Sequence, residues 1–326
     1  MERRKLGRTG LQVSRLALGC VTFGREIDEE ASFRVLDYAR EKGIQFLDTA
    51  EAYGGGQARQ YRRRHLGVED VREVSGEMSS SERILGRWLR SRGCRKEVVI
   101  CTKVSTGGAA ENISKALGGS LERLETDYVD LYEMHSADAA TPIAETLSAL
   151  SEAVAAGRVR SIGCSNYSAA QLREALETSR RLQVPRFEVI QNPYSLIARE
   201  AEGKLFPLCV KEEVGITTYS PLAAGFMAGK YTADRSAIPT DSRFGVIPGH
   251  ADIYFSDRNF QILERLRLEA QAREVPMVRL AMAYALTHPQ VDSVLIGART
   301  IAHVDNALKT LGTELEPEVR EEMSAW

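Results

Sequence analysis

The stretch FLDTAEAYGGG, residues 46–56, places a carboxylate and a phenol close together after a short apolar run. Asp48 ends the run, and Tyr53 follows five residues later, before three glycines. A turn would explain these residue types, because aspartate and glycine are common turn formers and tyrosine is often half-buried. If the two side chains instead belong to a reaction site, other parts of the chain must supply their partners.

Polar residues of the kinds used in catalysis also follow other apolar runs. In chain order they are Lys103, His135, Ser165 with Asn166, Gln191 and Tyr219. Each has an ordinary structural explanation by itself, and Lys103 could simply extend its amine to the surface. Their recurrence after successive runs favours one shared site, provided that the ends of the runs meet.

Short apolar runs alternate with longer amphipathic stretches along the chain. The runs predicted as strands are Leu16–Leu18, Ile44–Asp48, Val98–Lys103, Tyr128–Met134, Ser161–Cys164, Glu188–Gln191, Ile216–Tyr219 and Ser293–Ile296. The helical patterns between them include Ala31–Glu41, Ser81–Arg92, Ile143–Ala155, Ala169–Leu182 and Leu205–Glu213. This alternation predicts an α/β fold, a (β/α)8 TIM barrel, whose active site lies where the strands end. An open doubly wound sheet is the alternative.

The N-terminal residues predict a β-hairpin, since Arg3–Leu6 and Leu11–Val13 flank Gly7 and Gly10. We expect this hairpin to plug the amino-terminal end of the barrel. A length of 326 residues suits one barrel with additions, so we expect residues 1–326 to form a single domain.

The composition argues against several classes of partner. The 43 basic and 45 acidic residues leave a net charge of -2, which gives no sign of binding to nucleic acid or to an anionic membrane. No apolar stretch approaches the ~20 residues that span a bilayer, and the first residues lack the apolar core of a secretory signal. We therefore expect a cytoplasmic protein, and the sequence does not indicate an oligomeric state.

The cysteines and histidines are scattered along the chain. The five cysteines are Cys20, Cys94, Cys101, Cys164 and Cys209. Their spacing argues against disulfides and zinc and is typical of small buried residues in a reducing compartment. No two of the five histidines stand at metal-ligand spacing, so we expect no metal.

The motifs together resemble the aldo-keto reductase family over almost the full length of the chain. The resemblance rests on DTAEAYG (48–54), the lysine of CTK (103), the histidine of YEMH (135), GCSNY (163–167), QNPYSL (191–196) and YSPLAAG (219–225). It implies a (β/α)8 barrel that binds a nicotinamide cofactor without a Rossmann domain. It also implies a catalytic group that in this chain is Asp48, Tyr53, Lys103 and His135.

The chemistry of carbonyl reduction suits this catalytic group. Hydride from the nicotinamide goes to carbon, and a proton goes to oxygen. Tyrosine, with a pKa of ~10, is a weak acid at neutral pH, so we expect the ammonium of Lys103 to lower the pKa of Tyr53. Asp48 would hold Lys103, and His135 would donate a hydrogen bond to the carbonyl oxygen. The predicted reaction is the NADPH-dependent reduction of a small aldehyde or ketone, keto-sugars included.

The resemblance also implies the residues that bind the cofactor, NADP(H). Around the nicotinamide these are Asp48, Ser165, Asn166, Gln191 and, stacked on the ring, Tyr219. Along the pyrophosphate they are Ser220, Pro221, Leu222, Ala224, Lys230 and Arg243, with Gly19, Cys20 and Val21 from the first loop. At the adenosine end they are Gly297, Arg299, His303 and Asn306. Because a guanidinium suits a 2′-phosphate, Arg299 favours NADPH over NADH. Ala307 stands where the family often has asparagine.

Residues 55–79, GGQARQYRRRHLGVEDVREVSGEMS, depart most from the family pattern. The first half carries Arg59, Arg62, Arg63, Arg64 and His65, and the second half carries Glu69, Asp70, Arg72, Glu73 and Glu77. We expect this insertion at the mouth of the site. Either it is a lid whose arginines meet an anionic substrate, or its two halves pair with each other, face solvent or contact another subunit.

Two other functions fit parts of the sequence. One is an NADP(H)-binding regulatory or redox-sensing subunit with little turnover, because potassium-channel β subunits resemble the same family. The other is a barrel lyase or aldolase that forms a Schiff base on Lys103, although that reaction leaves Tyr53 unexplained.

Overall fold

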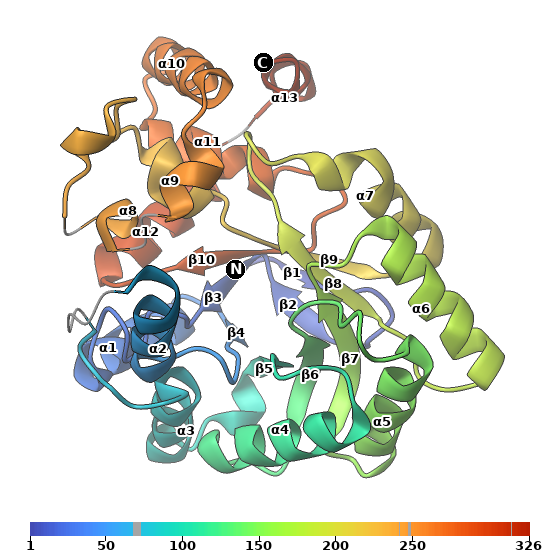
Figure 1. Cartoon of the computed structure of the whole chain (residues 1–326). Helices are drawn as coiled ribbons and strands as arrows, with labels where there is room; N and C mark the ends of the chain where they lie inside the picture. The colour runs from blue at the N-terminus through green and yellow to red at the C-terminus, as the bar shows by residue number, and fades with distance from the viewer. Residues whose placement is uncertain (68–72, 241, 247–248, 314) are drawn as a thin grey trace.

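A computed structural model of the chain describes residues 1–67, 73–240, 242–246, 249–313 and 315–326. Its centre is a closed barrel of parallel strands surrounded by helices (Figure 1). The barrel strands, in chain order, are β3 (Leu16–Gly19), β4 (Phe46–Asp48), β5 (Val99–Val104), β6 (Val129–Met134), β7 (Val159–Ser165), β8 (Val189–Pro193), β9 (Gly215–Tyr219) and β10 (Ser293–Gly297). Strand β10 pairs with both β3 and β9, which closes the barrel. The predicted (β/α)8 barrel is confirmed, and the alternative prediction of an open doubly wound sheet is wrong.

The helices occupy most of the chain between and around these strands. They are α1 (Glu29–Glu41), α2 (Gly55–Leu66), α3 (Ser80–Arg92), α4 (Ala110–Arg123), α5 (Ile143–Ala155), α6 (Ala169–Leu182), α7 (Glu200–Glu212), α8 (Arg243–Val246), α9 (Gly249–Tyr254), α10 (Asp257–Ala272), α11 (Met277–Leu286), α12 (Ile301–Thr310) and α13 (Pro317–Ser324). Short 3-10 turns are η1 (Arg95–Glu97), η2 (Ala223–Ala228) and η3 (Arg235–Ala237). Among the described residues, no helix combines the length and apolar character needed to cross a bilayer.

Local sequence explains where the helices begin. Ser168 accepts a hydrogen bond from the backbone of Gln171, and the Gln171 side chain bonds back to Ser168, so a capping box starts α6 at its predicted position. Helix α7 begins five residues before the predicted Leu205, because Glu200 and Glu202 suit the positive end of the helix dipole although they break the apolar pattern.

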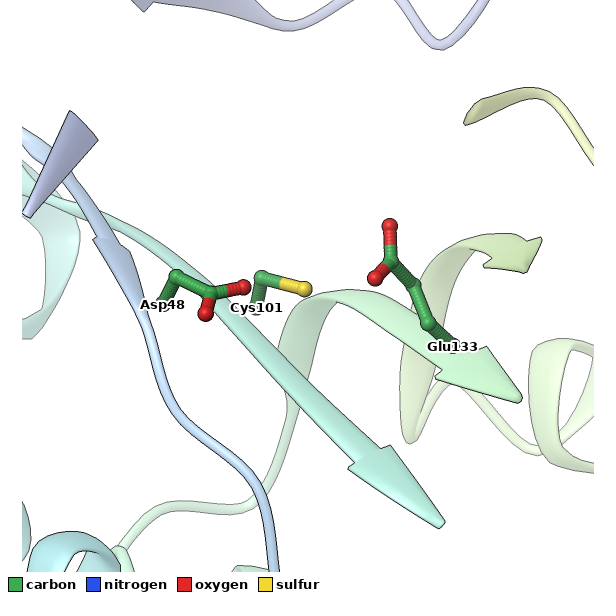
Figure 2. A group of neighbouring side chains, drawn as sticks. All are labelled: Asp48, Cys101 and Glu133. Carbon is green, nitrogen blue, oxygen red and sulfur yellow. The ribbon is translucent and has the colours of Figure 1, made fainter. Parts of the chain in front are cut away.

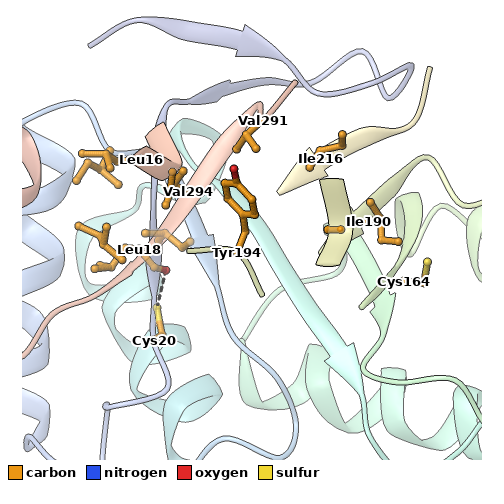
Figure 3. Packing of buried hydrophobic residues seen from close by; sticks show 14 of the residues in the cluster. Leu16, Leu18, Cys20, Cys164, Ile190, Tyr194, Ile216, Val291 and Val294 are labelled. Carbon is orange, nitrogen blue, oxygen red and sulfur yellow. Dashed lines mark hydrogen bonds between the residues drawn. The ribbon is translucent and has the colours of Figure 1, made fainter. Parts of the chain in front are cut away.

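Alternation along the strands divides the apolar side chains into two sets. One set packs between the barrel and its helices and includes Leu16, Leu18, Ile190, Ile216 and Val294 (Figure 3). The other fills the barrel interior together with two hairpin residues: Leu6, Val13, Ala17, Phe46, Cys101, Leu131, Val189 and Leu295. Since strand side chains repeat every second residue, the residues two positions after Phe46, Cys101, Leu131 and Val189 also face the interior. Those residues are Asp48, Lys103, Glu133 and Gln191. The interior therefore changes from apolar to polar toward the carboxyl ends of the strands.

The predicted hairpin is present as strands β1 (Arg3–Lys5) and β2 (Gln12–Ser14), paired antiparallel. Leu6 and Val13 are fully buried in the interior cluster. Gly7, in the left-handed region with φ +50, lies against the start of β9, where an added Cβ would stand 2.4 Å from the backbone nitrogen of Gly215. The hairpin thus covers the amino-terminal end of the barrel.

The insertion, residues 55–79, begins with helix α2 and returns alongside it. Arg62 binds Glu73 through both carboxylate oxygens, one at 2.6 Å from Nη2, and Arg59 contacts the same carboxylate at 3.3 Å. Glu73 is buried. These contacts favour the interpretation in which the two halves of the insertion pair with each other. Glu69, Asp70 and Arg72 lie outside the described residues.

The return of the insertion packs on loops near the barrel's carboxyl end. Ser79 Oγ donates to the carbonyl of Glu51 at 2.6 Å, and the Val74 amide donates to the carbonyl of Arg25 at 3.2 Å.

All five cysteines are buried and unpaired, as expected for small core residues.

Replacing Gly7 by alanine should destabilise the protein more than replacing Gly10. Gly10 also has a positive φ, +76, but an added Cβ there has open space around it. Gly10→Ala should cost ~1 kcal/mol from the backbone alone, and Gly7→Ala a further ~1–3 kcal/mol from overpacking against β9. Urea denaturation midpoints at constant m-value measure both costs. Equal shifts would contradict the close contact between the hairpin and β9.

Candidate active site

A buried ion pair lies at the centre of the polar layer. The Lys103 ammonium donates to Asp48 Oδ2 at 2.6 Å and to the backbone carbonyl of Thr49 at 2.8 Å. Asp48 Oδ2 also accepts from Gln191 Nε2 at 2.9 Å. Lys103 is fully buried and Asp48 is 1% exposed, so each charge depends on these partners in place of water.

The surroundings keep Lys103 protonated. Burial lowers the pKa of Lys103, but the opposing charge of Asp48, followed by Tyr53 and neighbouring acids, raises it well above its usual value. A lysine that forms a Schiff base needs a neutral amine and hence a lowered pKa. The structure therefore argues against the lyase or aldolase interpretation.

Tyr53 lies in the loop after β4, half-buried beside this pair. The Lys103 Nζ atom is 5.3 Å from the centre of the Tyr53 ring. Burial raises the pKa of Tyr53 to about 12, although Lys103 acts in the opposite direction. The predicted effect of Lys103, to lower the pKa of Tyr53, is thus present. It is smaller than the effect of burial, because removing a phenolate from water outweighs one neighbouring charge.

His135 follows β6 and meets Tyr53 edge to face, with ring centroids 5.5 Å apart. Burial lowers the pKa of His135, and the positive charge of Lys103 lowers it further, to about 3. The imidazole is therefore neutral, with one nitrogen that donates and one that accepts. Its Nδ1 lies 2.7 Å from the hydroxyl of Ser105.

Ser105 and Glu51 are site residues that the sequence analysis missed. The Glu51 carboxylate accepts from the backbone amides of Ser105, at 2.5 Å, and Thr106, at 3.0 Å, and so fixes the loop that carries the Ser105 hydroxyl. The sequence did contain a signal for Ser105, because it stands two residues after Lys103 and side chains two positions apart in an extended chain point to the same side. Nothing comparable marks Glu51.

The residues expected around a nicotinamide form one hydrogen-bonded chain. The Tyr219 hydroxyl donates to Asn166 Oδ1 at 2.7 Å. Asn166 Nδ2 donates to the carbonyl of His135 at 2.9 Å and to Ser165 Oγ at 3.1 Å. Ser165 Oγ in turn donates to the carbonyl of Gln191 at 2.8 Å. Residues from the ends of β6, β7, β8 and β9 are thereby linked.

The segment after β9 has an unusual backbone. Ser220, Ala223 and Ala224 all have positive φ values, of 57, 48 and 57, a conformation that costs non-glycine residues free energy and concentrates at functional sites. Pro221 is buried and Leu222 is partly buried. Turns of this kind direct backbone N–H groups toward a common centre and are typical of anion-binding loops.

A cationic cluster forms where the loops after β3, β9 and β10 meet. Glu26, which the sequence analysis missed, accepts from Arg25 and Arg243, each at 2.5 Å, and lies 3.7 Å from Arg299. Three guanidinium groups thus share one carboxylate. Burial lowers the pKa of His303, and the positive charges of Arg299 and Lys230 lower it further. These three predicted residues therefore lie close to one another.

The remaining predicted cofactor residues surround the same loops. Gly297 is exposed at the end of β10, with open space around its Cα. Helix α12 exposes Asn306 and His303 and buries Ala307, so of the two neighbouring positions Asn306 is the one that can meet a ligand. The first loop follows β3 with Gly19 and Cys20 buried and Val21 partly exposed.

Asp48, Cys101 and Glu133 come together inside the barrel (Figure 2), with one potential ligand atom from each within 4.8 Å of the others. No local pattern in the sequence indicates this group, because its members come from three strands. The Lys103 ammonium already lies 2.6 Å from Asp48, where a cation would bind. Burial also raises the pKa of the Cys101 thiol well above its usual value, and a protonated thiol is a poor metal ligand.

Comparisons with known proteins agree with this geometry. The model of the aldo/keto reductase family matches residues 15–325. The chain is 32% identical to the uncharacterized oxidoreductase YrpG of Bacillus subtilis, over 98% of this chain and 94% of the relative. It is 33% identical to a probable voltage-gated potassium channel subunit beta of Oryza sativa subsp. japonica, over 100% and 96%. It is 28% identical to versiconal hemiacetal acetate reductase of Aspergillus parasiticus, over 98% and 94%.

The fold is a TIM barrel, and the polar group at the carboxyl end of its strands is consistent with an oxidoreductase. The match over nearly the whole chain shows that the protein belongs to the aldo/keto reductase family.

Replacing Ser105 by alanine should loosen His135. The variant removes the 2.7 Å contact to Nδ1, a hydrogen bond that contributes ~1 kcal/mol, so the ring loses its fixed orientation and tautomer. We expect shifted ¹⁵N resonances of the His135 ring in NMR spectra and a roughly fivefold loss of reductase kcat/KM. Ser136→Ala, at an exposed neighbouring serine, is the control. Unchanged His135 resonances in Ser105→Ala would show that Ser105 does not orient the imidazole.

Proposed function

We propose that the protein reduces an aldehyde or ketone to the alcohol, with NADPH as hydride donor and Tyr53 as general acid. The observation that supports this most strongly is the juxtaposition of Tyr53 with a buried ammonium 5.3 Å from its ring and with a neutral imidazole. A proton donor, a fixed positive charge and a neutral hydrogen-bond donor are what a developing alkoxide requires.

Tyr53 supplies the proton in this proposal. With its pKa raised to about 12, Tyr53 stays protonated at neutral pH and has a proton to give. When the proton leaves, the phenolate forms beside the Lys103 ammonium, which stabilises it in a site with little water. The anchored Asp48 holds Lys103 in place, so the charge does not have to reorganise during the reaction.

His135 orients the carbonyl in this proposal. Its pKa of about 3 keeps the ring neutral, so its protonated nitrogen can donate to the substrate oxygen without competing with Tyr53 as an acid. If Ser105 donates to Nδ1, the remaining proton is on Nε2, the nitrogen available to the substrate.

The residues present fit a cofactor that carries phosphates. Within the described part of the chain, Arg25, Arg243 and Arg299 pair with one carboxylate, that of Glu26, which leaves positive charge for an anion. The left-handed turn around Ala223 would hold the pyrophosphate, and the chain of Ser165, Asn166 and Tyr219 would hold the nicotinamide. When bound, the cofactor supplies the hydride.

A regulatory role is the alternative, because one relative is named as a probable potassium channel subunit beta. In that role the protein would bind NADP(H) and a partner but turn over little. The filled positions Asp48, Tyr53, Lys103 and His135 favour turnover. Specificity within the carbonyl class depends on the loops after the strands, and a panel of aldehydes, ketones and keto-sugars with NADPH oxidation as the signal would define it.

Replacing Tyr53 by phenylalanine should abolish most of the reductase activity. The change keeps the ring beside Lys103 and removes only the acidic proton, so kcat should fall by roughly 10²–10⁴-fold. The Kd for NADPH, measured by fluorescence titration, should stay nearly constant. Tyr61→Phe, at an exposed tyrosine of α2, should retain full activity. Near-normal turnover by Tyr53→Phe would rule out Tyr53 as the acid.

Replacing Arg299 by alanine should weaken the binding of NADPH more than that of NADH. A lost hydrogen bond to a charged group costs ~1.5–3 kcal/mol, so the Kd for NADPH should rise by roughly 10- to 100-fold, while that for NADH changes little because NADH lacks the 2′-phosphate. Arg34→Ala, at an exposed arginine of α1, should change neither value. Equal affinity of the native protein for both cofactors would contradict the preference for NADPH.

A further inference from the structure

Glu133 is a buried carboxyl group that the proposed reaction leaves unused. It lies on β6, with Lys103 of β5 as its partner on one side and Gly163 of β7 on the other. Its side chain is fully buried. In Figure 2 the side chains of Asp48 and Cys101 point toward it across the barrel interior. Glu133 thus belongs to the same polar layer as the Lys103–Asp48 pair.

The hydrogen bonds of Glu133 lead to Asp48 through one intermediate. Gln191 Nε2 lies 2.9 Å from Asp48 Oδ2 and 3.4 Å from Glu133 Oε2, so one amide group connects the two carboxyls. The other oxygen of Glu133, Oε1, is buried without a hydrogen-bond partner among the described residues. A buried ionised carboxylate needs several donors, and the long contact from Gln191 with the weak thiol donor of Cys101 supplies few.

Space for this carboxyl depends on Gly163. A Cβ at position 163 would stand 3.2 Å from Glu133 Oε1 and 2.8 Å from the backbone carbonyl of Val189. The neighbouring strand therefore accommodates the larger glutamate by having no side chain at the paired position.

The charges around Glu133 also favour its neutral form. The ionisable groups that face it are Asp48 from β4, Cys101 and Lys103 from β5, and Cys164 from β7. One ammonium cannot balance two carboxylates, and two like charges in one site raise the pKa of one of them. Burial and the charge of Asp48 raise the pKa of Glu133 to about 8, although Lys103 and a hydrogen bond from Cys101 act in the opposite direction.

We propose that Glu133 is a positioning residue for the reduction. As a neutral acid, Glu133 holds the Gln191 amide against Asp48. When Glu133 ionises, it adds a negative charge beside Lys103, and this charge makes Tyr53 a weaker acid. This inference rests on the proposed role of Tyr53. It implies that reduction slows as the pH rises through the ionisation of Glu133, in addition to any slowing caused by other groups.

Glu133→Gln tests the ionisation without any assay of activity. The folded-state pKa, about 8, lies above the ordinary value of 4.5, so the folded protein holds one more proton than the unfolded chain between these values. The contribution of this extra proton to the free energy of unfolding is complete below pH 4.5 and is lost as the pH rises toward 8. From pH 5.5 to 7.5, the unfolding constant of the native apoprotein should therefore rise relative to that of Glu133→Gln by up to about tenfold per pH unit.

The reductase assay tests the link to Tyr53. The ratio of native to Glu133→Gln kcat should fall steadily from pH 7 to 9, because only the native protein gains the extra negative charge. Glu152→Gln, at an exposed glutamate of α5, should follow the native protein in both measurements. If Glu133→Gln does not fold, the infrared band of a protonated carboxylic acid in the native protein should disappear as the pH passes 8.

The outcomes separate this inference from the proposed function. Parallel stability profiles for the native protein and Glu133→Gln, or an infrared band that is absent at pH 7, would show that Glu133 is already ionised and would overturn the inference. Different stability profiles with identical pH profiles of kcat would show that Glu133 does not act on Tyr53 and would also overturn it. Failure of the native protein to reduce any carbonyl would reject the proposed function and leave the stability result unaffected.

Discussion

The site depends on keeping one ammonium charged in the interior of the barrel. Removing Lys103 from water costs several kcal/mol unless opposing charge and hydrogen bonds replace the solvent. Asp48 at 2.6 Å and the Thr49 carbonyl at 2.8 Å do so, and Gln191 in turn satisfies Asp48. Because β4, β5 and β8 each contribute one member, the closed barrel is a condition for the charge to exist at all.

The arrangement of layers in the barrel explains why chemistry is confined to one end. The hairpin residues Leu6 and Val13 complete an apolar layer with Phe46, Cys101 and Leu131, which closes the amino-terminal end and excludes water from below the ion pair. One pleat further along the same strands, the side chains become polar. The loops beyond them then add Tyr53, His135 and the cationic cluster around Glu26, so rigid strands hold the buried charges and the loops hold the groups that meet ligands.

Burial sets the protonation states of the groups around the ion pair, whereas Lys103 keeps its charge because the attraction of Asp48, together with that of neighbouring groups, outweighs burial. Tyr53 shows this directly, since a neighbouring ammonium does not offset the cost of burying a phenolate. His135 is neutral for the same reason, and Glu133 has its pKa raised to about 8. A site with one cation, one carboxylate and several neutral proton donors is electrically balanced, and it is ready to stabilise negative charge that forms on a substrate oxygen.

The sequence by itself determined the fold and the central members of the candidate site. Eight short apolar runs that alternate with amphipathic stretches indicated a closed parallel barrel, and the polar residues that follow the runs, such as Lys103 and His135, had to converge once the barrel closed. The barrel could be predicted because the order of apolar runs and amphipathic stretches is a local property of the chain.

Only the tertiary structure decided which groups touch and which are charged. The contact of Ser105 with His135, the three arginines on Glu26, and the pairing of Arg59 and Arg62 with Glu73 join residues whose distances no local pattern specifies. Glu133 had a local signal, since it stands two residues before His135 and therefore faces the interior. Its protonation, however, depends on burial and on the charges of neighbouring strands, and these exist only after the barrel has closed.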